Sequence, residues 1–217
     1  MLVLAVDTAT PAVTAGVVLV DTDVDPTRLE MLAECVTVDA KAHGELLTPH
    51  VLAALDAAGR RLADVDAIVC GAGPGPFTGL RAGMATAAAL GHALDVPVHP
   101  VCTLDAIASA VAGHGPLLVT TDARRKELYW ATYDEDGTRT AGPAVDKPAD
   151  IPQLDRRAGA TIYADVLSMP HTGHEYPTPA GLVRAADLTR PPRPFTPLYL
   201  RRPDATEPGA RKRVTTP

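Results

Sequence analysis

Cysteines and aromatic residues are scarce in this chain of 217 residues. Its three cysteines, Cys35, Cys70 and Cys102, are widely spaced, and no Cys-x-x-Cys pair occurs. That pattern excludes a zinc ribbon and a disulfide framework, since both need clustered or numerous cysteines. Aromatic residues make up 4% and hydrophobic residues 46% of the chain, so its core must consist mainly of alanine, valine and leucine. We expect reduced thiols in a cytoplasmic protein.

Long apolar runs and targeting signals are also lacking. No apolar run is long enough to span a bilayer. The start of the chain, Met1 to Asp7, has no basic region and reaches an acid at once, unlike a signal peptide. The net charge of −6 excludes a surface that is basic throughout and binds nucleic acid by charge alone. We therefore expect no membrane partner.

Motifs that carry catalysis or bind metal ions are missing as well. Serine is scarce and no Gly-x-Ser-x-Gly sequence occurs. His171 and His174 lie among glycines and prolines, where a two-histidine zinc helix is not expected. His43 and His50 fall on one predicted helix, but not at the spacing of metal ligands. The sequence predicts no metal site and no catalytic residue.

A glycine-rich stretch, Ala67 to Arg81, is the most informative part of the chain. A short apolar run that predicts a buried strand is followed by alternating glycines and prolines and then by an alanine-rich helix. This order places free backbone N–H groups at a helix N-terminus, where anions are stabilised. Thr78 is the expected N-cap, and Arg81 falls in the first turn, where a cation needs an anionic partner. The loop is neither a Walker A loop nor a Rossmann fingerprint.

Two interpretations of this loop stay open. In the first it contacts a nucleotide phosphate; in the second it is a tight turn, with Arg81 paired to a nearby Asp. Strands that end in Asp7 and Asp122 suggest two acids that face one cleft. The candidate anion-site residues are Asp7, Gly71, Gly73, Gly75, Thr78, Arg81 and Asp122.

The helix after the loop carries a row of small residues at a spacing of four, which places them on one face: Gly79, Gly83, Ala87 and Gly91. Each glycine costs a helix roughly 1 kcal/mol relative to alanine, so close contact with another element should offset that cost. Two interpretations are open: the row packs on the chain's own first helix, or it forms an interface with another subunit. If it is an interface, Gly83→Leu should block partner binding and leave the fold largely intact.

Hydrophobic periodicity and turn residues predict alternating strands and helices. The expected strands are 2–6, 12–20, 29–38, 65–70, 96–101, 117–121, 128–133 and 160–164, and the expected helices are 43–58, 78–94, 104–112 and 179–188. In both halves a buried strand ends in an Asp, and a tight turn then leads into an antiparallel strand. We therefore expect two related lobes, 1–113 and a smaller 114–201. A disordered tail, 202–217, contains the basic triplet Arg211-Lys212-Arg213.

The glycine-rich motif resembles the signature of a known family. Gly71-Ala72-Gly73-Pro74-Gly75-Pro76-Phe77-Thr78-Gly79-Leu80-Arg81-Ala82-Gly83 is similar to the TsaB signature Gly-x-Gly-Pro-Gly-Ser-Phe-Thr-Gly-Leu-Arg-Ile-Gly. Further matches are Asp7-Thr8-Ala9-Thr10, His43 with Leu46-Leu47-Thr48-Pro49, Asp122-Ala123-Arg124-Arg125-Lys126-Glu127-Leu128-Tyr129, and Pro197-Leu198-Tyr199-Leu200-Arg201. The chain departs from the signature at Pro76, where the family has Ser, and at Ala82, where it has Ile.

The resemblance implies an α/β, two-lobed actin/sugar-kinase-like (ribonuclease H-like) fold with a reduced second lobe. It also implies a non-catalytic subunit in the modification of tRNA to threonylcarbamoyladenosine, which pairs with TsaD and, through that complex, meets the ATPase TsaE and tRNA. The expected partner-interface residues are Leu47, Val51, Leu55, Gly79, Gly83, Met84, Ala87 and Gly91. Homodimers through the same surface are a further expectation. No cofactor is required, although ATP or ADP with Mg at the complex interface is compatible with the family.

Two other functions compete with this scaffold role. A small-molecule kinase or ATPase of the same superfamily would use Asp7 or Asp122 to hold Mg, and its ATP turnover would be abolished by Asp7→Asn. A peptidase, suggested by an old label of this family, would need a metal site or a nucleophile, and the sequence supplies neither.

Overall fold

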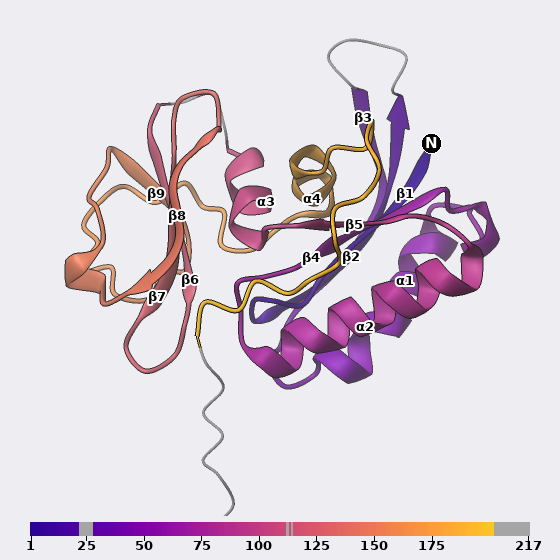
Figure 1. Ribbon diagram of the computed structural model, residues 1–217, viewed down its shortest axis with the longest axis horizontal. Helices are drawn as coiled ribbons and strands as arrows, with labels where there is room; N and C mark the ends of the chain where they lie inside the picture. Colours follow the sequence, from indigo (N-terminus) through magenta and orange to yellow (C-terminus); the bar gives the residue numbers. More distant parts are fainter. Residues whose placement is uncertain (22–27, 112, 114, 202–217) are drawn as a thin grey trace, which may run out of the picture.

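The computed structural model describes residues 1–21, 28–111, 113 and 115–201. The predicted tail 202–217, with its basic triplet, lies outside the described residues. Two sheets and the helices around them form two lobes that lie side by side (Figure 1). The prediction of a two-lobed α/β fold of the actin/sugar-kinase-like type is confirmed.

The first sheet has the strand order β3-β2-β1-β4-β5. Its strands are β1 (Leu2–Asp7), β2 (Ala12–Asp21), β3 (Arg28–Val38), β4 (Ala67–Gly71) and β5 (Val98–Val101). β1 pairs with β2 in antiparallel and with β4 in parallel orientation, and Leu4 lies beside Ile68. The central strands β1 and β4 are buried along their whole length, which explains their continuous apolar sequences.

Helices cover both faces of this sheet. α1 (His43–Ala57) and α2 (Phe77–Leu94) lie beside each other on one face (Figure 1). α4 (Pro179–Ala185), which begins with Pro as predicted, packs Leu182 and Val183 against the opposite face. Since α4 comes from the C-terminal part of the chain, the first sheet is completed by a segment far away in sequence.

The second sheet repeats the first in reduced form. Its strands are β6 (Leu117–Asp122), β7 (Leu128–Tyr133), β8 (Arg139–Asp146) and β9 (Arg156–Gly159), in the order β8-β7-β6-β9. β6 pairs with β7 in antiparallel and with β9 in parallel orientation, as β1 pairs with β2 and β4. This sheet therefore has the pattern β3-β2-β1-β4, and the described part of the chain adds no counterpart of β5.

Two strands of the second sheet differ from the sequence prediction. β8 was not predicted, because its sequence has no apolar alternation, contains Gly142 and Pro143, and is exposed or only half-buried. The strand expected at 160–164 is wrong: the structure has β9 four residues earlier, at Arg156–Gly159. Two of the four residues of β9 are arginines, so its sequence has no apolar run that would predict a strand.

The lobes are joined by α3 (Thr103–Ser109) and by the C-terminal segment. Leu104 and Ile107 of α3 enter the core of the second lobe, together with the partly buried Leu198 and Leu200. The N–H of Leu198 donates to the carbonyl of Ala72, 2.8 Å away, so the end of the chain is also tied to the glycine loop. Short 3-10 turns occur at Leu62–Asp64 and Pro148–Asp150. Within the described part of the chain, no helix is long and apolar enough to cross a membrane.

Candidate functional site

Asp7, at the end of β1, lies in the interior and holds three segments together. Its side chain is completely buried. Oδ1 accepts a hydrogen bond from the N–H of Ala9 at 2.8 Å, and Oδ2 accepts one from the hydroxyl of Thr103 at 2.7 Å. Burial raises the pKa of Asp7 from its ordinary value of 3.8 to about 6, although these hydrogen bonds and the nearby His43 act in the opposite direction. A carboxylate in this position fixes how the three segments meet, and it is closed off from solvent.

The glycine loop closes on this same turn. A side chain at Gly71 would overlap Oδ2 of Asp7, and a side chain at Gly75 would overlap the carbonyl of Ala9. Gly73 has a φ of +91°, a conformation that side chains other than glycine's rarely adopt. The prediction that these glycines admit an anion is therefore corrected: they make room for the chain's own turn after β1.

The expected roles of Thr78 and Arg81 are also wrong. α2 begins at Phe77 and has Pro76 at its N-cap, so Thr78 is already inside the helix and caps nothing. Arg81 lies beyond the first turn. Its Nε donates to the hydroxyl of Tyr199 at 2.8 Å, and its guanidinium lies over the rings of Phe77 and Tyr199, at 5.6 and 5.5 Å from their centroids. Among the residues that the structure describes, Arg81 has no carboxylate partner.

A pocket of about 320 Å³ lies where the lobes meet, and we call it the inter-lobe pocket. Hydroxyls of the first lobe and charges of the second line it, including Thr8, Thr10, Thr78, Asp122 and Arg124. The remaining candidate anion-site residues do not line it: Asp7, Gly71, Gly73, Gly75 and Arg81. The two acids predicted to face one cleft are thus separated, with Asp122 at the pocket and Asp7 in the core.

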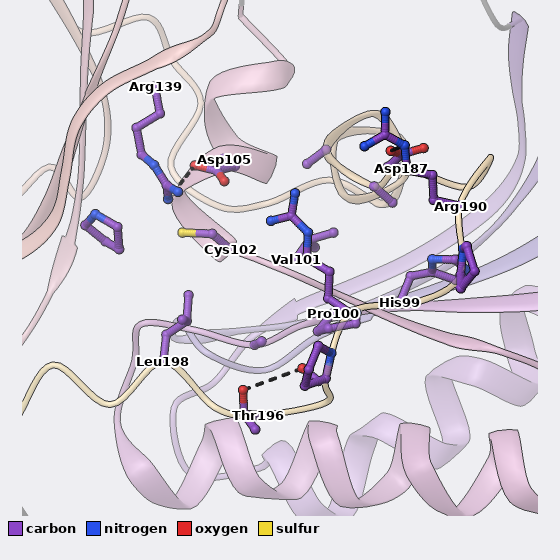
Figure 2. A pocket seen from close by; sticks show the side chains of 17 residues that line it. His99, Pro100, Val101, Cys102, Asp105, Arg139, Asp187, Arg190, Thr196 and Leu198 are labelled. Atoms are coloured by element: carbon purple, nitrogen blue, oxygen red, sulfur yellow. Dashed lines mark hydrogen bonds and ion pairs between the residues drawn. The ribbon is translucent and has the colours of Figure 1, made fainter.

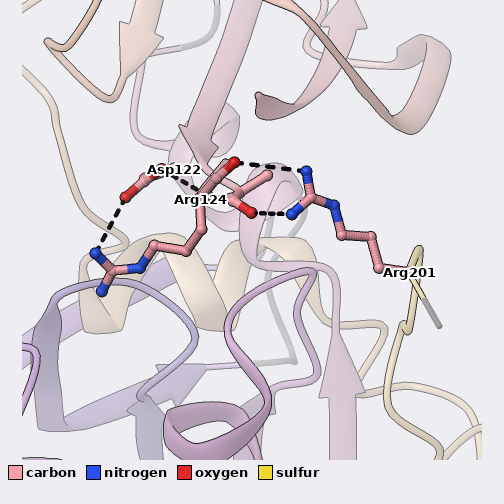
Figure 3. Close-up of polar contacts among 4 residues, drawn as sticks. Asp122, Arg124 and Arg201 are labelled. Carbon is pink, nitrogen blue, oxygen red and sulfur yellow. Dashed lines mark hydrogen bonds and ion pairs between the residues drawn. The ribbon is translucent and has the colours of Figure 1, made fainter. Parts of the chain in front are cut away.

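Asp122 is itself engaged by the turn that follows β6. Its Oδ1 accepts from the N–H of Arg124 at 2.7 Å, and the guanidinium of Arg124 lies 3.6 Å from Oδ2 (Figure 3). In the described ranges, no three histidine, cysteine or acidic side chains are placed to hold a metal ion together. Each of the two acids that the kinase-like alternative could use, Asp7 or Asp122, is therefore already engaged by groups of the chain itself.

The turn beside Asp122 is held in an uncommon conformation. Arg124, Arg125 and Lys126 have φ angles of 61°, 54° and 61°, in the left-handed region. Arg201, far along the chain, braces this turn: it donates to the carbonyls of Ala123 and Arg124 (Figure 3). Arg201 also pairs with Glu127. In the sequence, Arg201 is only the last residue of a terminal motif, and no spacing signal links it to a turn more than seventy residues away.

The small-residue row of α2 is buried inside the protomer. A side chain at Gly79 would overlap the carbonyl of Thr8, one at Gly83 the hydroxyl of Thr8, and one at Gly91 the side chain of Val98. The predicted interface residues are in fact all buried: Leu47, Val51, Leu55, Gly79, Gly83, Met84, Ala87 and Gly91. Their assignment to a partner interface is therefore wrong, because they face the sheet, the turn after β1 and β5.

The opposite face of the same two helices is exposed. On α2 the exposed residues are Thr78, Arg81, Ala85, Ala88, Ala89, His92 and Ala93; on α1 they are Gly44, Glu45, Thr48, Pro49, Leu52, Ala53, Asp56 and Ala57. We call these residues the outer α1–α2 face. It is rich in alanine, and Leu52 is 55% exposed. Sequence reasoning missed it because α2 carries alanine or glycine on every side, so that small size alone does not tell the inward face from the outward one.

Comparisons with known proteins bear on this architecture. The family model described as TsaD, tRNA N6-adenosine threonylcarbamoyltransferase, matches residues 31–186. The chain belongs to the TsaD family. It is 56% identical over 206 residues to an uncharacterised protein of Mycobacterium tuberculosis (strain ATCC 25618 / H37Rv), covering 94% of this chain and 93% of that protein.

Named relatives place the chain among TsaB-type members of the TsaD family. It is 33% identical over 139 residues to the tRNA threonylcarbamoyladenosine biosynthesis protein TsaB of Escherichia coli (strain K12), covering 63% of this chain and 56% of that protein. A crystal structure from Pseudomonas aeruginosa, described as an uncharacterised protein with similarity to peptidase YEAZ, superposes with a TM-score of 0.73 at 27% identity. That superposition covers 92% of this chain and 99% of the other. The resemblance predicted from the glycine-rich motif is thus confirmed.

Proposed function

We propose that this chain is a non-catalytic subunit required for threonylcarbamoyl transfer to tRNA, and that it acts in the cytoplasm by binding a TsaD protein through the outer α1–α2 face. TsaB-named relatives are assigned to tRNA threonylcarbamoyladenosine biosynthesis by their names, which supports the process. The burial of Asp7 supports the absence of catalysis by this chain, because the acid that would hold a metal ion is used inside the fold.

The observation that carries the proposal is the exposed, alanine-rich side of α2 beside the exposed Leu52 of α1. Alanines let another helix approach closely, and burial of this apolar face would stabilise a complex. Arg81, Glu45 and Asp56 stand among the apolar residues and supply the polar contacts that an interface needs. In the absence of TsaD, a second copy of the chain would bind the same face. TsaE and tRNA would bind to the complex that this chain forms with TsaD, and no cofactor of this chain's own is required.

Reconstituted threonylcarbamoyl transfer tests this role. Supplied with ATP and an activated threonylcarbamoyl donor, TsaD and TsaE of the same genome should modify tRNA when this chain is added and fail to do so without it, and this chain alone should modify none. Transfer at an equal rate in its absence would contradict a required subunit.

The rival role, a small-molecule kinase or ATPase, is favoured only by the hydroxyls and Asp122 at the inter-lobe pocket. It predicts ATP turnover by the isolated chain. We expect none at any Mg concentration; turnover that Asp7→Asn abolishes would establish the rival instead.

A further inference from the structure

A second and larger cavity, of about 580 Å³, lies on a part of the molecule that the proposed function does not use (Figure 2). Its walls come from the edge strand β5, the start of α3, the start of β8 and the segment that follows α4. We call it the arginine pocket, after Arg139, Arg190 and Arg193 in its lining. Its volume falls within the roughly 300–1,000 Å³ that are usual for small-molecule sites.

The pocket gathers positive charge although the chain is acidic overall. Arg139 comes from the second lobe, whereas Arg190 lies on the other side of the pocket (Figure 2). Arg193 belongs to the same segment as Arg190, three residues further along the chain. Two acids in the lining are already engaged. Asp105 accepts from Arg139 at 3.2 Å and from the hydroxyl of Tyr133 at 2.8 Å.

The second acid, Asp187, is engaged in the same way. It accepts from the N–H and the hydroxyl of Thr189, and it pairs with Nε of Arg190 at 3.3 Å. Arg193 contributes to lowering the pKa of Asp187, but it forms no ion pair within 4.0 Å with another described residue. The pocket therefore has unused donor capacity and no free carboxylate to satisfy it.

His99 adds a buried polar group to the lining. The residue is 6% exposed, and burial lowers its pKa, which favours the neutral ring with one donor and one acceptor. Pro100, Val101 and Leu198 line the pocket beside it and give it an apolar wall. The lining thus combines cations, one buried imidazole and an apolar surface.

Pairing of a foreign strand with β5 is disfavoured at this edge. The carbonyls of Pro97 and Val101 accept from Ile68 and Ala72, so by alternation those of Val98 and Pro100 point away from the sheet. Pro100 has no N–H to donate at that edge. The space beside β5 is therefore suited to a compact ligand rather than to an added strand.

We propose that the arginine pocket binds a small organic oxyanion, a phosphate or carboxylate attached to an apolar body, with its head between Arg139 and Arg193 and its body against Pro100 and Leu198. Guanidinium groups form strong, bidentate hydrogen bonds with such heads. This inference does not depend on the outer α1–α2 face, so either proposal can fail without the other.

Histidine NMR of the full chain tests the site, with phenyl phosphate and benzoate as probes at low salt. His99 lines the arginine pocket, His43 lines the inter-lobe pocket and His92 is exposed on α2. We expect saturable shifts of the His99 ring with at least one probe, while His43 and His92 stay unchanged. The probe that binds more tightly identifies the head group as phosphate or carboxylate.

Matched variants decide whether the arginines are responsible. Arg193→Gln should weaken binding roughly tenfold or more, since a charge-assisted hydrogen bond is lost. Arg184→Gln removes the same charge from an exposed position of α4 outside the lining and should leave binding unchanged. Thermal melting checks that both variants are folded.

Three results would overturn the proposal: shifts that do not saturate, equal weakening in both variants, or a response of His43 that matches that of His99. Binding of RNA with no response to either small anion would overturn it as well, because the site would then be a surface for a phosphate backbone.

Discussion

At the scale of single residues, the acid that the sequence made a candidate for the functional site, Asp7, serves the fold instead. Asp7 joins the turn after β1, the start of α3 and the glycine loop, because Ala9 and Thr103 donate to it and Gly71 packs against it. Its complete burial costs free energy whenever the carboxylate is charged. Asp7 therefore lowers stability at neutral pH while it determines how the three segments meet.

The first prediction concerns Asp7→Asn. The pKa of Asp7 is about 6 in the folded state against an ordinary 3.8, so the folded state binds the proton more tightly and stability falls as pH rises from about 4 to 6. Asparagine keeps an acceptor for Ala9 and can pair with the hydroxyl of Thr103. The variant should gain up to about 3 kcal/mol in the free energy of unfolding at pH 7.5 and almost nothing at pH 4. Urea denaturation at both pH values measures this.

Asp64→Asn is the control, because it should change the free energy of unfolding at neutral pH in the opposite direction. The pKa of Asp64 is lowered, chiefly by the hydrogen bond from the Arg61 side chain, so its carboxylate stabilises the fold above its ordinary pKa, an effect lost as pH falls. The variant should lose stability at neutral pH and not in acid. An equal gain from Asp7→Asn at both pH values would contradict the role given to burial.

The second prediction replaces the earlier expectation for Gly83. A side chain here would overlap the hydroxyl of Thr8, which donates to the carbonyl of Gly79 at 2.7 Å. Gly83→Ala should therefore destabilise the protein itself, by about 1–3 kcal/mol. Gly44→Ala is the matched control on α1: nothing lies within 4 Å of its added carbon, so it should stabilise by up to about 1 kcal/mol. Denaturation curves in which Gly83→Ala equals the parent would refute the inward packing of this row.

At the scale of elements, the turn between β6 and β7 stores strain. Arg124, Arg125 and Lys126 are consecutive left-handed residues, each of which costs roughly 1–2 kcal/mol relative to the right-handed region. Arg201 and the hydrogen bond from the N–H of Glu127 to the carbonyl of Arg124 hold the turn in place. The turn also presents Arg124 to the inter-lobe pocket, so the strain fixes the position of a charge between the lobes.

The third prediction relieves this strain. Lys126 is exposed, and glycine adopts its φ of 61° without steric cost. Lys126→Gly should therefore leave stability unchanged or raise it by up to about 1 kcal/mol. Lys147→Gly is the control, since Lys147 is exposed with an ordinary φ of −71° and should lose up to about 1 kcal/mol. Thermal melts in which both variants lose the same amount would contradict a strained turn.

At the scale of the whole molecule, one topology occurs twice, and a helix from outside its own strands completes each copy. α4 covers the sheet of the first lobe, while α3 enters the core of the second. The strands of the first sheet were predictable because their apolar runs are continuous. β8 and β9 were not, because strand pairing and cover by later segments, rather than local pattern, decide their state.

For the candidate site, the sequence predicted that the backbone is closely approached, but not which groups approach it. The glycines of the loop and of α2 correctly indicated that something approaches the backbone closely, yet the approaching groups are Asp7, Ala9 and Thr8 of the same chain. Spacing in a sequence fixes which residues share a helix face, but not which face meets the core. Only the structure shows which face of α1 and α2 packs inward, and therefore that the outer α1–α2 face is exposed.

The central claim is that the outer α1–α2 face binds TsaD, and complex formation measured by size-exclusion chromatography with light scattering tests it most directly. The parent chain and TsaD of the same genome should form a stable complex. Ala85→Glu and Ala89→Glu, both at exposed positions of α2, should melt like the parent and weaken the complex at least roughly tenfold, because each buries an unpaired charge in the interface. Ala164→Glu, at an exposed position of the second lobe, should bind normally. A normal complex with both α2 variants would contradict the account.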